Sequence, residues 1–299
     1  DEKLRVLLIS KDNFFRCNTR KAKGGMAVAL YDPDSPKSHF SDTLKAGGHL
    51  NNKHAVEVLT TEVVGRINDL SSTGFLFDKN NDTGFFNLGL EGCHTHRRVL
   101  HAQGDRMGVE IFNFLFEQVQ NKKNTFFMNH SEITDLNIVN SQLESVSIFS
   151  PIFGTQVLQC NALVMASGGY SGIYKRNTSD SSFFGNTIPL AYKAGIGIAD
   201  LEFMQFHPTV FVKEGFETLL MSEAIRGEGA LLLNPNKKRF MDSYHPEAEL
   251  ASRDIVSRSM WEESLKCNSQ DFYLDLRPIG EKTILNLSEI ESNLSCKLK

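Results

Sequence analysis

The stretch NALVMASGGYSG, residues 161–172, runs from apolar residues into two glycines. An apolar run of this length predicts a buried strand. Glycines that follow a strand let backbone N–H groups come close to a phosphate or a flavin, as in α/β nucleotide-binding folds. An ordinary strand-to-helix turn would give the same pattern. The stretch therefore predicts an α/β fold and leaves open whether its turn binds a nucleotide.

The segments before this stretch carry both strand and helix patterns. Residues 6–9 form a short apolar run, which is typical of a buried strand in a parallel sheet. Residues 54–70 and 107–120 have apolar side chains at helical spacing and predict two helices. The buried side of the second helix is expected to comprise Ile111, Phe112, Leu115 and Phe116.

Later segments continue the alternation and then change character. Residues 133–159 alternate strand-like runs with turn residues, and residues 187–199 predict a helix followed by a glycine-rich exit. The glycine pair 24–25, ahead of an apolar run, indicates a close approach of the backbone to another group. Beyond Asp200, charged and aromatic residues mix with prolines. We therefore expect a domain boundary near residue 200.

Composition narrows the class of protein. The chain has 299 residues, of which 40% are hydrophobic and 23% charged, with a net charge of −4. Mixed charges of this kind predict no nucleic-acid partner. No apolar run approaches the roughly 18–20 residues that span a bilayer, so no membrane partner is expected. Five scattered cysteines without a CxxC pair favour a reducing compartment, and we predict a soluble, cytoplasmic protein.

The stretch LEGCHTHRRVLHAQGD, residues 90–105, concentrates polar residues and raises three alternatives. Cys93, His94 and His96 could bind zinc, but their spacing is tighter than that of usual zinc ligands. Arg97 and Arg98 disfavour a dication and favour an anion such as a dicarboxylate or a pyrophosphate. A solvated polar loop is the third alternative.

Three further motifs each allow a structural and a functional interpretation. His207 precedes a proline, which restricts its backbone, and a hydrogen-bonded core histidine is the simpler interpretation. Ser222 and Arg226 lie four residues apart and could share a helix face that holds a carboxylate. Ordinary ion pairs at a helix end explain them equally well. The same applies to Arg253 at the start of a predicted helix.

The order of these motifs resembles one enzyme family. EGCHTHRRVLHA, ASGGYSGIY, DLEFMQFHPT, SEAIRGEGALLLN, RFM and ELASRDIVSRSM follow one another as in the flavoprotein group of L-aspartate oxidases, fumarate reductases and succinate dehydrogenases. The resemblance covers residues 6–275. The segment similar to EGCHTHRRVLHA makes the L-aspartate oxidases the most similar members.

The resemblance implies a fold. It is an α/β, Rossmann-like FAD-binding domain over residues 1–199, incomplete, followed by a truncated α+β capping domain over residues 200–299. The strand and GxGxxG motif that relatives carry ahead of Val6 are absent, as is the segment downstream of residue 299. We therefore expect a fragment of a longer enzyme.

The resemblance also implies an activity. The family members most similar to this chain oxidise L-aspartate to iminoaspartate with FAD, toward quinolinate and NAD, and oxygen or fumarate then reoxidises the flavin. Quinolinate synthase is the implied partner, and L-aspartate and fumarate are the implied dicarboxylate ligands. Relatives with covalent FAD use a histidine six residues before the first glycine of the loop, where this chain has Asn18. The FAD is therefore expected to be non-covalent.

Family positions carry over to individual residues. Arg253 matches the arginine that shuttles a proton and pairs with a substrate carboxylate. Glu91 matches the glutamate that recognises the amino group, and it would work with the neighbouring arginines as a substrate clamp. The other implied substrate contacts are His207, Ser222 and Glu223. The implied FAD contacts are Ser10, Lys11, Thr19, Lys23, Gly24, Gly25, Ala166, Ser167, Gly168 and Gly169. No metal is expected.

Several positions depart from the family pattern. Gly185-Asn186-Thr187 stands where relatives have Gly-Asp-Gly, and Cys93, Met107 and Ser252 replace a glycine, a threonine and a proline. Two alternatives to the oxidase therefore stay open. One is a soluble fumarate reductase or succinate dehydrogenase flavoprotein, and the other is a truncated copy without catalysis.

Overall fold

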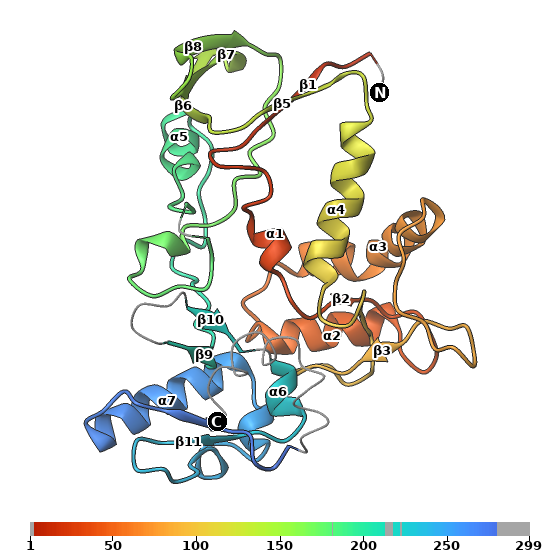
Figure 1. Cartoon of the computed structure of the whole chain (residues 1–299), viewed down its shortest axis with the longest axis vertical. Helices are drawn as coiled ribbons and strands as arrows, with labels where there is room; N and C mark the ends of the chain where they lie inside the picture. Colours follow the sequence, from red (N-terminus) through yellow and green to blue (C-terminus); the bar gives the residue numbers. More distant parts are fainter. Residues whose placement is uncertain (1–2, 181, 213–217, 222, 280–299) are drawn as a thin grey trace. The chain divides into compact units, whose positions relative to one another are not determined.

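The structure is a computed structural model that describes residues 3–180, 182–212, 218–221 and 223–279 (Figure 1). Contacts divide the chain into two units. Unit 1 comprises Asp1–Ala22 with Ile111–Met204, and unit 2 comprises Lys23–Glu110 with Gln205–Lys299. Each unit is thus built from two separate segments. The assignment of residues 1–199 and 200–299 to two domains of different function stays a prediction. Within the described residues no helix combines the length and the apolar character that a membrane crossing requires.

Unit 1 contains the parallel strand pair that the apolar run predicted, but the predicted burial is wrong, because Val6 is 41% exposed and residues 7–9 are only half-buried. Strand β1 (Val6–Ile9) pairs in parallel with β5 (Thr125–Met128), with Val6 opposite Thr125. The short helix α1 (Asn18–Lys21) follows β1, and α4 (Met107–Gln120) leads into β5. The helix predicted over residues 107–120 is therefore confirmed.

Aromatic side chains pack α4 against the N-terminal segment of unit 1. Phe116 lies 5.1 Å from Phe15 and 5.6 Å from Phe127 between ring centroids, and Phe112 lies 5.6 Å from Phe15. Leu115 is 46% exposed, so its predicted burial is wrong. The aromatic contacts cover Phe112 and Phe116, and they leave Leu115 open to solvent.

An antiparallel meander forms the rest of the strand structure in unit 1. Strands β6 (Glu132–Val139), β7 (Gln142–Ser150) and β8 (Gly154–Gln159) pair in that order, as the alternation predicted. Residues 161–169 form no strand, which corrects the prediction for this run. A strand needs a hydrogen-bonded neighbour. No described strand pairs with this run, and Val164 is 88% exposed. The 3-10 helix η1 (Ser171–Ile173) and the predicted helix, α5 (Thr187–Lys193), follow.

Unit 2 begins with a small sheet and two capped helices. Strands β2 (Met26–Ala27), β4 (Val99–Leu100) and β3 (Leu88–Gly89) form an antiparallel sheet in that order. Helix α2 (Pro36–Ala46) starts where the Ser35 side chain accepts a hydrogen bond from the backbone of Ser38. Helix α3 (Lys53–Ser72), capped by Asn52, confirms the helix predicted over residues 54–70.

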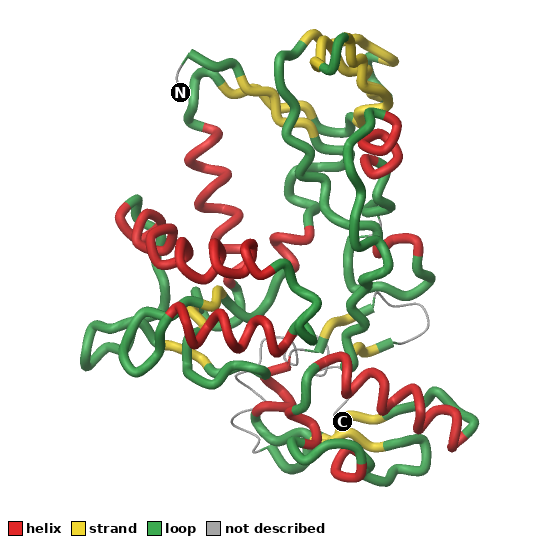
Figure 2. Tube along the Cα trace, turned by 180° about the vertical axis from the view of Figure 1, so that it is seen from behind, coloured by secondary structure: helices red, strands yellow, loops and turns green. Residues whose placement is uncertain are grey.

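The second segment of unit 2 surrounds its own small core. Strand β9 (Val210–Phe211) pairs with β10 (Leu219–Leu220), and β11 (Leu231–Leu233) pairs with β12 (Tyr273–Asp275), both antiparallel. The helices are α6 (Glu223–Gly227), η2 (Met241–Ser243), η3 (Ala248–Leu250) and α7 (Arg253–Cys267). Leu232 of β11 packs with Val256 of α7, the helix that lies beside the β11–β12 pair in Figures 1 and 2.

The glycine pair ahead of β2 makes the close approach that the sequence indicated. A Cβ on Gly25 would overlap the carbonyl oxygen of Leu100 and crowd the side chain of Val99. Both neighbours belong to β4, the partner strand of β2. At Gly25 the close approach is therefore between two segments of the chain itself.

This overlap predicts a strong effect of adding one methyl group. Gly25→Ala should destabilise the protein by at least about 2 kcal/mol, because backbone must move to relieve the overlap. Gly65→Ala is the matched control, since Gly65 lies in α3 with nothing within 4 Å of an added Cβ. That change should stabilise by about 0.5–1 kcal/mol through helix propensity. Urea denaturation measures both, and equal midpoints for the two variants would contradict the prediction.

Candidate functional site

Two of the predicted site residues are in direct contact in unit 2. Arg253 is the first residue of α7 and Glu223 the first residue of α6. The Nε of Arg253 donates a hydrogen bond to Oε2 of Glu223 at 2.7 Å. Its Nη1 donates to Oε1 of Gln205 at 3.1 Å. Two helix starts thus hold a guanidinium and a carboxylate together, and Gln205 is a partner that sequence reasoning missed.

Glu91 lies in the same unit, on the loop before β4. A Cβ on Gly24 would lie 3.0 Å from Oε1 of Glu91, and a Cβ on Gly92 would overlap Oε1 of Glu223. The two glycines thus make room for two carboxylates. Burial, and then the negative charge of Glu223, raise the pKa of Glu91 against the opposing effect of His101 and Arg253. A cation placed beside Glu91 would relieve this unfavourable environment.

His207 is half-buried beside the same charges. Its Nδ1 lies 3.1 Å from the backbone oxygen and 3.3 Å from the backbone nitrogen of Thr209. Burial and the positive charges of Arg253 and Arg226 lower the pKa of His207 from 6.5 to about 4. The imidazole is therefore neutral at neutral pH, and Thr209 holds one of its two ring nitrogens.

Arg226, which the sequence paired with Ser222 as a possible carboxylate-holding residue, lies beside the carboxylate of Glu223. It is 1% exposed, and its Nη1 donates to the backbone oxygen of Glu249. Its Nη2 lies 3.8 Å from Oε2 of Glu223. Nε and Nη2 have no hydrogen-bond partner among the described residues, and burial lowers the pKa of the guanidinium. Ser222, predicted as a substrate contact, lies outside the described residues.

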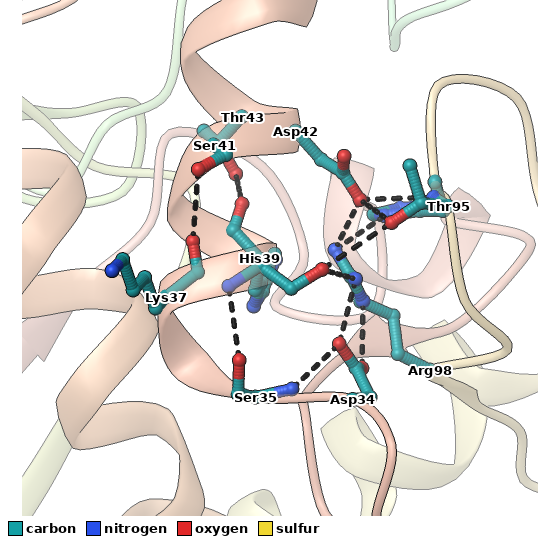
Figure 3. Close-up of polar contacts among 11 residues, drawn as sticks. Asp34, Ser35, Lys37, His39, Ser41, Asp42, Thr43, Thr95 and Arg98 are labelled. Carbon is teal, nitrogen blue, oxygen red and sulfur yellow. Dashed lines mark hydrogen bonds and ion pairs between the residues drawn. The ribbon is translucent and has the colours of Figure 1, made fainter.

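One of the two arginines predicted as an anion clamp, Arg98, does not have that role in the structure. The side chain of Arg98 is fully buried and binds Asp34 and Asp42 of the chain itself (Figure 3). It is therefore occupied by internal carboxylates, and it is not a substrate ligand as the clamp interpretation required. Arg97 is exposed. No group of three or more potential metal ligands occurs among the described residues.

Part of the predicted cofactor-binding set surrounds a cavity in unit 1. The cavity has a volume of about 400 Å³, within the range of small-molecule sites. Ser167 and Gly168, with φ of +75° at Gly168, share its lining with apolar residues of α5 and its flanks. The hydroxyl groups of Ser167 and Thr187 contact each other at its edge. Apolar walls with hydroxyls and a left-handed glycine fit one portion of a dinucleotide. Ala166 and Gly169 adjoin this lining.

The other predicted cofactor residues lie in both units. In unit 1, Ser10 follows the last residue of β1 and its backbone N–H donates to the backbone oxygen of Met128, and Thr19 is exposed on α1. Lys11 pairs with Glu132 at 3.3 Å. In unit 2, Lys23 pairs with Asp105 at 3.0 Å, next to Gly24 and Gly25. The structure therefore does not gather the whole set in a single described cavity.

Sequence comparisons place the chain among FAD-binding proteins. A family model described as "FAD binding domain" matches residues 1–290. The chain is 36% identical over 276 residues to an L-aspartate oxidase of Bacillus subtilis, covering 92% of the chain and 51% of that protein. It is 38% identical over 256 residues to an L-aspartate oxidase of Agrobacterium fabrum, covering 86% and 48%. The chain thus spans about half the length of the curated relatives it matches.

Solved structures of the same group share the fold. A quinol fumarate reductase of E. coli carrying a point mutation aligns with a TM-score of 0.88 at 28% identity, covering 96% of this chain and 51% of that one. The Mycobacterium smegmatis Sdh1 structure in complex with UQ1 aligns with a TM-score of 0.75 at 28% identity, covering 99% and 51%. The predicted α/β FAD-binding fold is therefore confirmed, and the chain corresponds to about half of the fold's full length in these proteins.

The environment of His207 predicts its protonation state. At about pH 5.5 its imidazole should remain neutral, whereas an ordinary histidine is largely protonated. Because unfolding restores the ordinary pKa, this residue makes the folded state less stable as pH falls from 6.5 toward about 4. Imidazole ¹⁵N NMR spectra test the charge state, with His207→Gln assigning the resonance. A His207 ring that is largely protonated at pH 5.5 would contradict the prediction.

Proposed function

The chain belongs to the FAD binding domain family, and we propose that it carries the substrate and cofactor sites of an enzyme that oxidises L-aspartate to iminoaspartate. The observation that carries this proposal is the set of charges in unit 2, where Glu91 and Glu223 lie beside Arg253. A dicarboxylate with an amino group needs cationic and anionic partners at once. The L-aspartate oxidases among the relatives support the same substrate.

Arg253 is the proposed catalytic residue. Among the described residues, Glu223 and Gln205 occupy its Nε and one N–H of Nη1. A guanidinium has five N–H donors, so the others can bind a substrate carboxylate. Glu223 and Gln205 orient the guanidinium, which reduces the entropy lost when substrate binds. We assign to Arg253 both the carboxylate contact and a proton relay, in which the guanidinium would take up one proton from the reacting centre as its Nε–H proton passes to Glu223, so that it stays cationic.

His207 and Ser222 are the proposed polar contacts to the substrate. Thr209 holds Nδ1 of His207, so Nε2 is the nitrogen that can face a ligand. The low pKa of about 4 keeps the ring neutral, and a neutral ring places no further positive charge beside Arg253 and Arg226. Ser222 would add a hydroxyl donor next to Glu223 along the chain.

Glu91 is the proposed determinant for the amino group. The raised pKa of Glu91 reflects burial and the neighbouring Glu223, so its ionised form lacks a sufficient partner in this structure. The ammonium of L-aspartate would supply that partner. Succinate and fumarate have no ammonium and would leave the two carboxylates to repel each other. The arrangement thus favours the amino dicarboxylate.

FAD is the cofactor of the family to which the chain belongs. When bound, FAD supplies the acceptor for the hydride that leaves the substrate Cα. We propose that it binds non-covalently, because Asn18 stands where a covalent member has histidine, and Oδ1 of Asn18 accepts a hydrogen bond from the backbone of Asp180. The proposed contacts are Ser10, Lys11, Thr19, Lys23, Gly24, Gly25, Ala166, Ser167, Gly168 and Gly169.

The product suggests the partner. Iminoaspartate is an imine that water hydrolyses, so a consuming enzyme close by is an advantage, and quinolinate synthase is the proposed consumer. Oxygen or fumarate would reoxidise the flavin. The proposed location is the cytoplasm. The cysteines of the described residues, namely Cys17, Cys93, Cys160 and Cys267, are free thiols, which agrees with a reducing compartment.

A fumarate reductase or succinate dehydrogenase flavoprotein is the second candidate. The likeness to the quinol fumarate reductase of E. coli, with a TM-score of 0.88, favours it. Its substrates share both carboxylates with L-aspartate and lack the amino group. Use of succinate together with no use of L-aspartate would identify this candidate.

The first experiment is anaerobic reduction of the flavin in the FAD-loaded complete enzyme. L-aspartate should bleach the visible flavin absorbance, and succinate should bleach it far more slowly. Arg253→Leu should keep the flavin spectrum and lose bleaching by at least about a thousandfold, because the cationic carboxylate partner is removed from the reacting centre. Stopped-flow absorbance gives the rates.

Arg258→Leu is the matched control for that variant. Arg258 is exposed on α7 and pairs only with Asp254 at 2.8 Å among the described residues. It should reduce its flavin at the normal rate. Near-normal bleaching in Arg253→Leu would remove Arg253 from its catalytic role, and bleaching by succinate alone would overturn the L-aspartate proposal.

Substitution of Glu91 tests substrate selection. Glu91→Gln should raise the KM for L-aspartate about tenfold or more, because an ammonium loses its anionic partner, and should change the KM for succinate much less. Glu57→Gln, exposed on α3, is the matched control. Steady-state kinetics on both substrates measures the difference. Equal losses on the two substrates would show that Glu91 does not select for the amino group.

A further inference from the structure

All three nitrogens of the Arg98 guanidinium donate hydrogen bonds inside the protein. Nε and Nη2 donate to the two carboxylate oxygens of Asp34 at 2.9 and 2.8 Å. Nη1 donates to Oδ2 of Asp42 at 2.8 Å and lies 3.5 Å from Nδ1 of His94. Nη2 also reaches the hydroxyl of Ser38 at 3.2 Å. A buried charge saturated in this way holds its surroundings in one geometry.

Asp42, a residue of α2, also binds Thr95, a second residue of the loop that carries Arg98. Its Oδ2, which accepts from Arg98, also accepts from the backbone N–H and the hydroxyl of Thr95, both at 2.9 Å (Figure 3). The hydroxyl of Thr95 lies 3.3 Å from that of Ser38. The backbone N–H of Arg98 donates to Gly89 at 3.1 Å. Residues 95 and 98 are therefore fixed to α2 and to β3.

The fixed part of the loop adjoins the residue that selects the substrate. Glu91 is four residues before Thr95, and its backbone oxygen accepts from the N–H of His94 at 3.3 Å. This hydrogen bond closes a turn through Cys93, whose φ is +67°. The same turn places Gly92 against the carboxylate of Glu223. A shift at Thr95 would therefore reach Glu91 through one short turn.

We propose that Arg98, Asp42 and Thr95 form an anchor of positioning residues that sets where Glu91 stands and thereby the preference for an amino dicarboxylate. The inference rests on the proposed function. Among the described residues, no hydrogen bond or ion pair joins the anchor to Arg253, so the anchor acts through the loop that carries Glu91. Removing a hydrogen bond of the anchor should therefore weaken the preference for L-aspartate over succinate and leave kcat nearly unchanged.

Thr95→Val is the primary test, in the FAD-loaded complete enzyme. Valine keeps the shape and the backbone N–H, and it removes only the hydroxyl hydrogen bonds at a position exposed to solvent. The variant should fold. The KM for L-aspartate should rise about fivefold to tenfold, because the loop that carries Glu91 loses one of its ties to α2, while kcat and the KM for succinate change less than about twofold.

Two further variants separate positioning from general damage. Thr95→Ser retains the hydroxyl and should restore the normal KM for L-aspartate. Asp42→Asn retains Asp34 as the partner of Arg98 and should raise the same KM. Arg66→Ala, which removes only exposed ion pairs of α3, should change nothing. A Thr95→Val enzyme with a normal KM, or with equal rises for L-aspartate and succinate, would overturn the anchor. A parent enzyme that does not oxidise L-aspartate at all would instead overturn the proposed function.

Discussion

The positive charge of Arg98 stands where solvent does not reach it, and the first segment of unit 2 is arranged to satisfy it. A buried guanidinium costs several kcal/mol unless carboxylates and hydrogen bonds compensate it. Asp34 and Asp42 supply two carboxylates from either side of the N-terminus of α2. Burial alone would raise the pKa of Asp42, but the Thr95 hydrogen bonds and Arg98 outweigh it and lower that pKa. Burial, followed by the charge of Arg98, lowers the pKa of both His39 and His94. The lowered pKa values disfavour protonation of His39 and His94, so these side chains add no further positive charge beside Arg98.

The spacing of apolar residues correctly predicted helices whose pattern is local in the sequence. It failed where burial depends on partners far away in the sequence. The helices α3 and α4 follow from apolar spacing alone. Residues 161–169 have the composition of a strand, yet no described neighbour pairs with them. Leu115 has helical spacing, yet the aromatic side chains that pack on α4 cover Phe112 and Phe116. Hydrophobic pattern states which residues can be buried, and only the tertiary partners decide which of them are.

In the candidate site, too, the sequence identified some residues and could not reveal their partners. The family resemblance singled out Glu91, Glu223 and Arg253, and the structure places all three in unit 2 with Arg253 bound to Glu223. Arg98 was assigned to the substrate because adjacent arginines attract anions, and the structure supplies those anions from Asp34 and Asp42. No local pattern announces this pairing, since more than fifty residues separate Asp42 from Arg98. Gln205 escaped for the same reason, because its importance comes from the Arg253 side chain that it contacts.

Two networks of opposite character therefore meet in one short loop. Around Arg98 all three guanidinium nitrogens donate to carboxylates of the protein, and these bonds tie this part of the loop to α2 and to the residues before it. Around Glu91 the balance is incomplete, because burial and Glu223 disfavour its ionised form. A site gains most from a ligand when its own groups are unsatisfied and yet held in place, since little further ordering is then required. Cys93, whose backbone is left-handed, lies in the four-residue segment between Glu91 and Thr95. The chain turns sharply there from one network to the other. Selection of an ammonium therefore needs two things together. The loop must be held in place at Thr95, and the carboxylate of Glu91 must lack a sufficient cationic partner until the ligand binds.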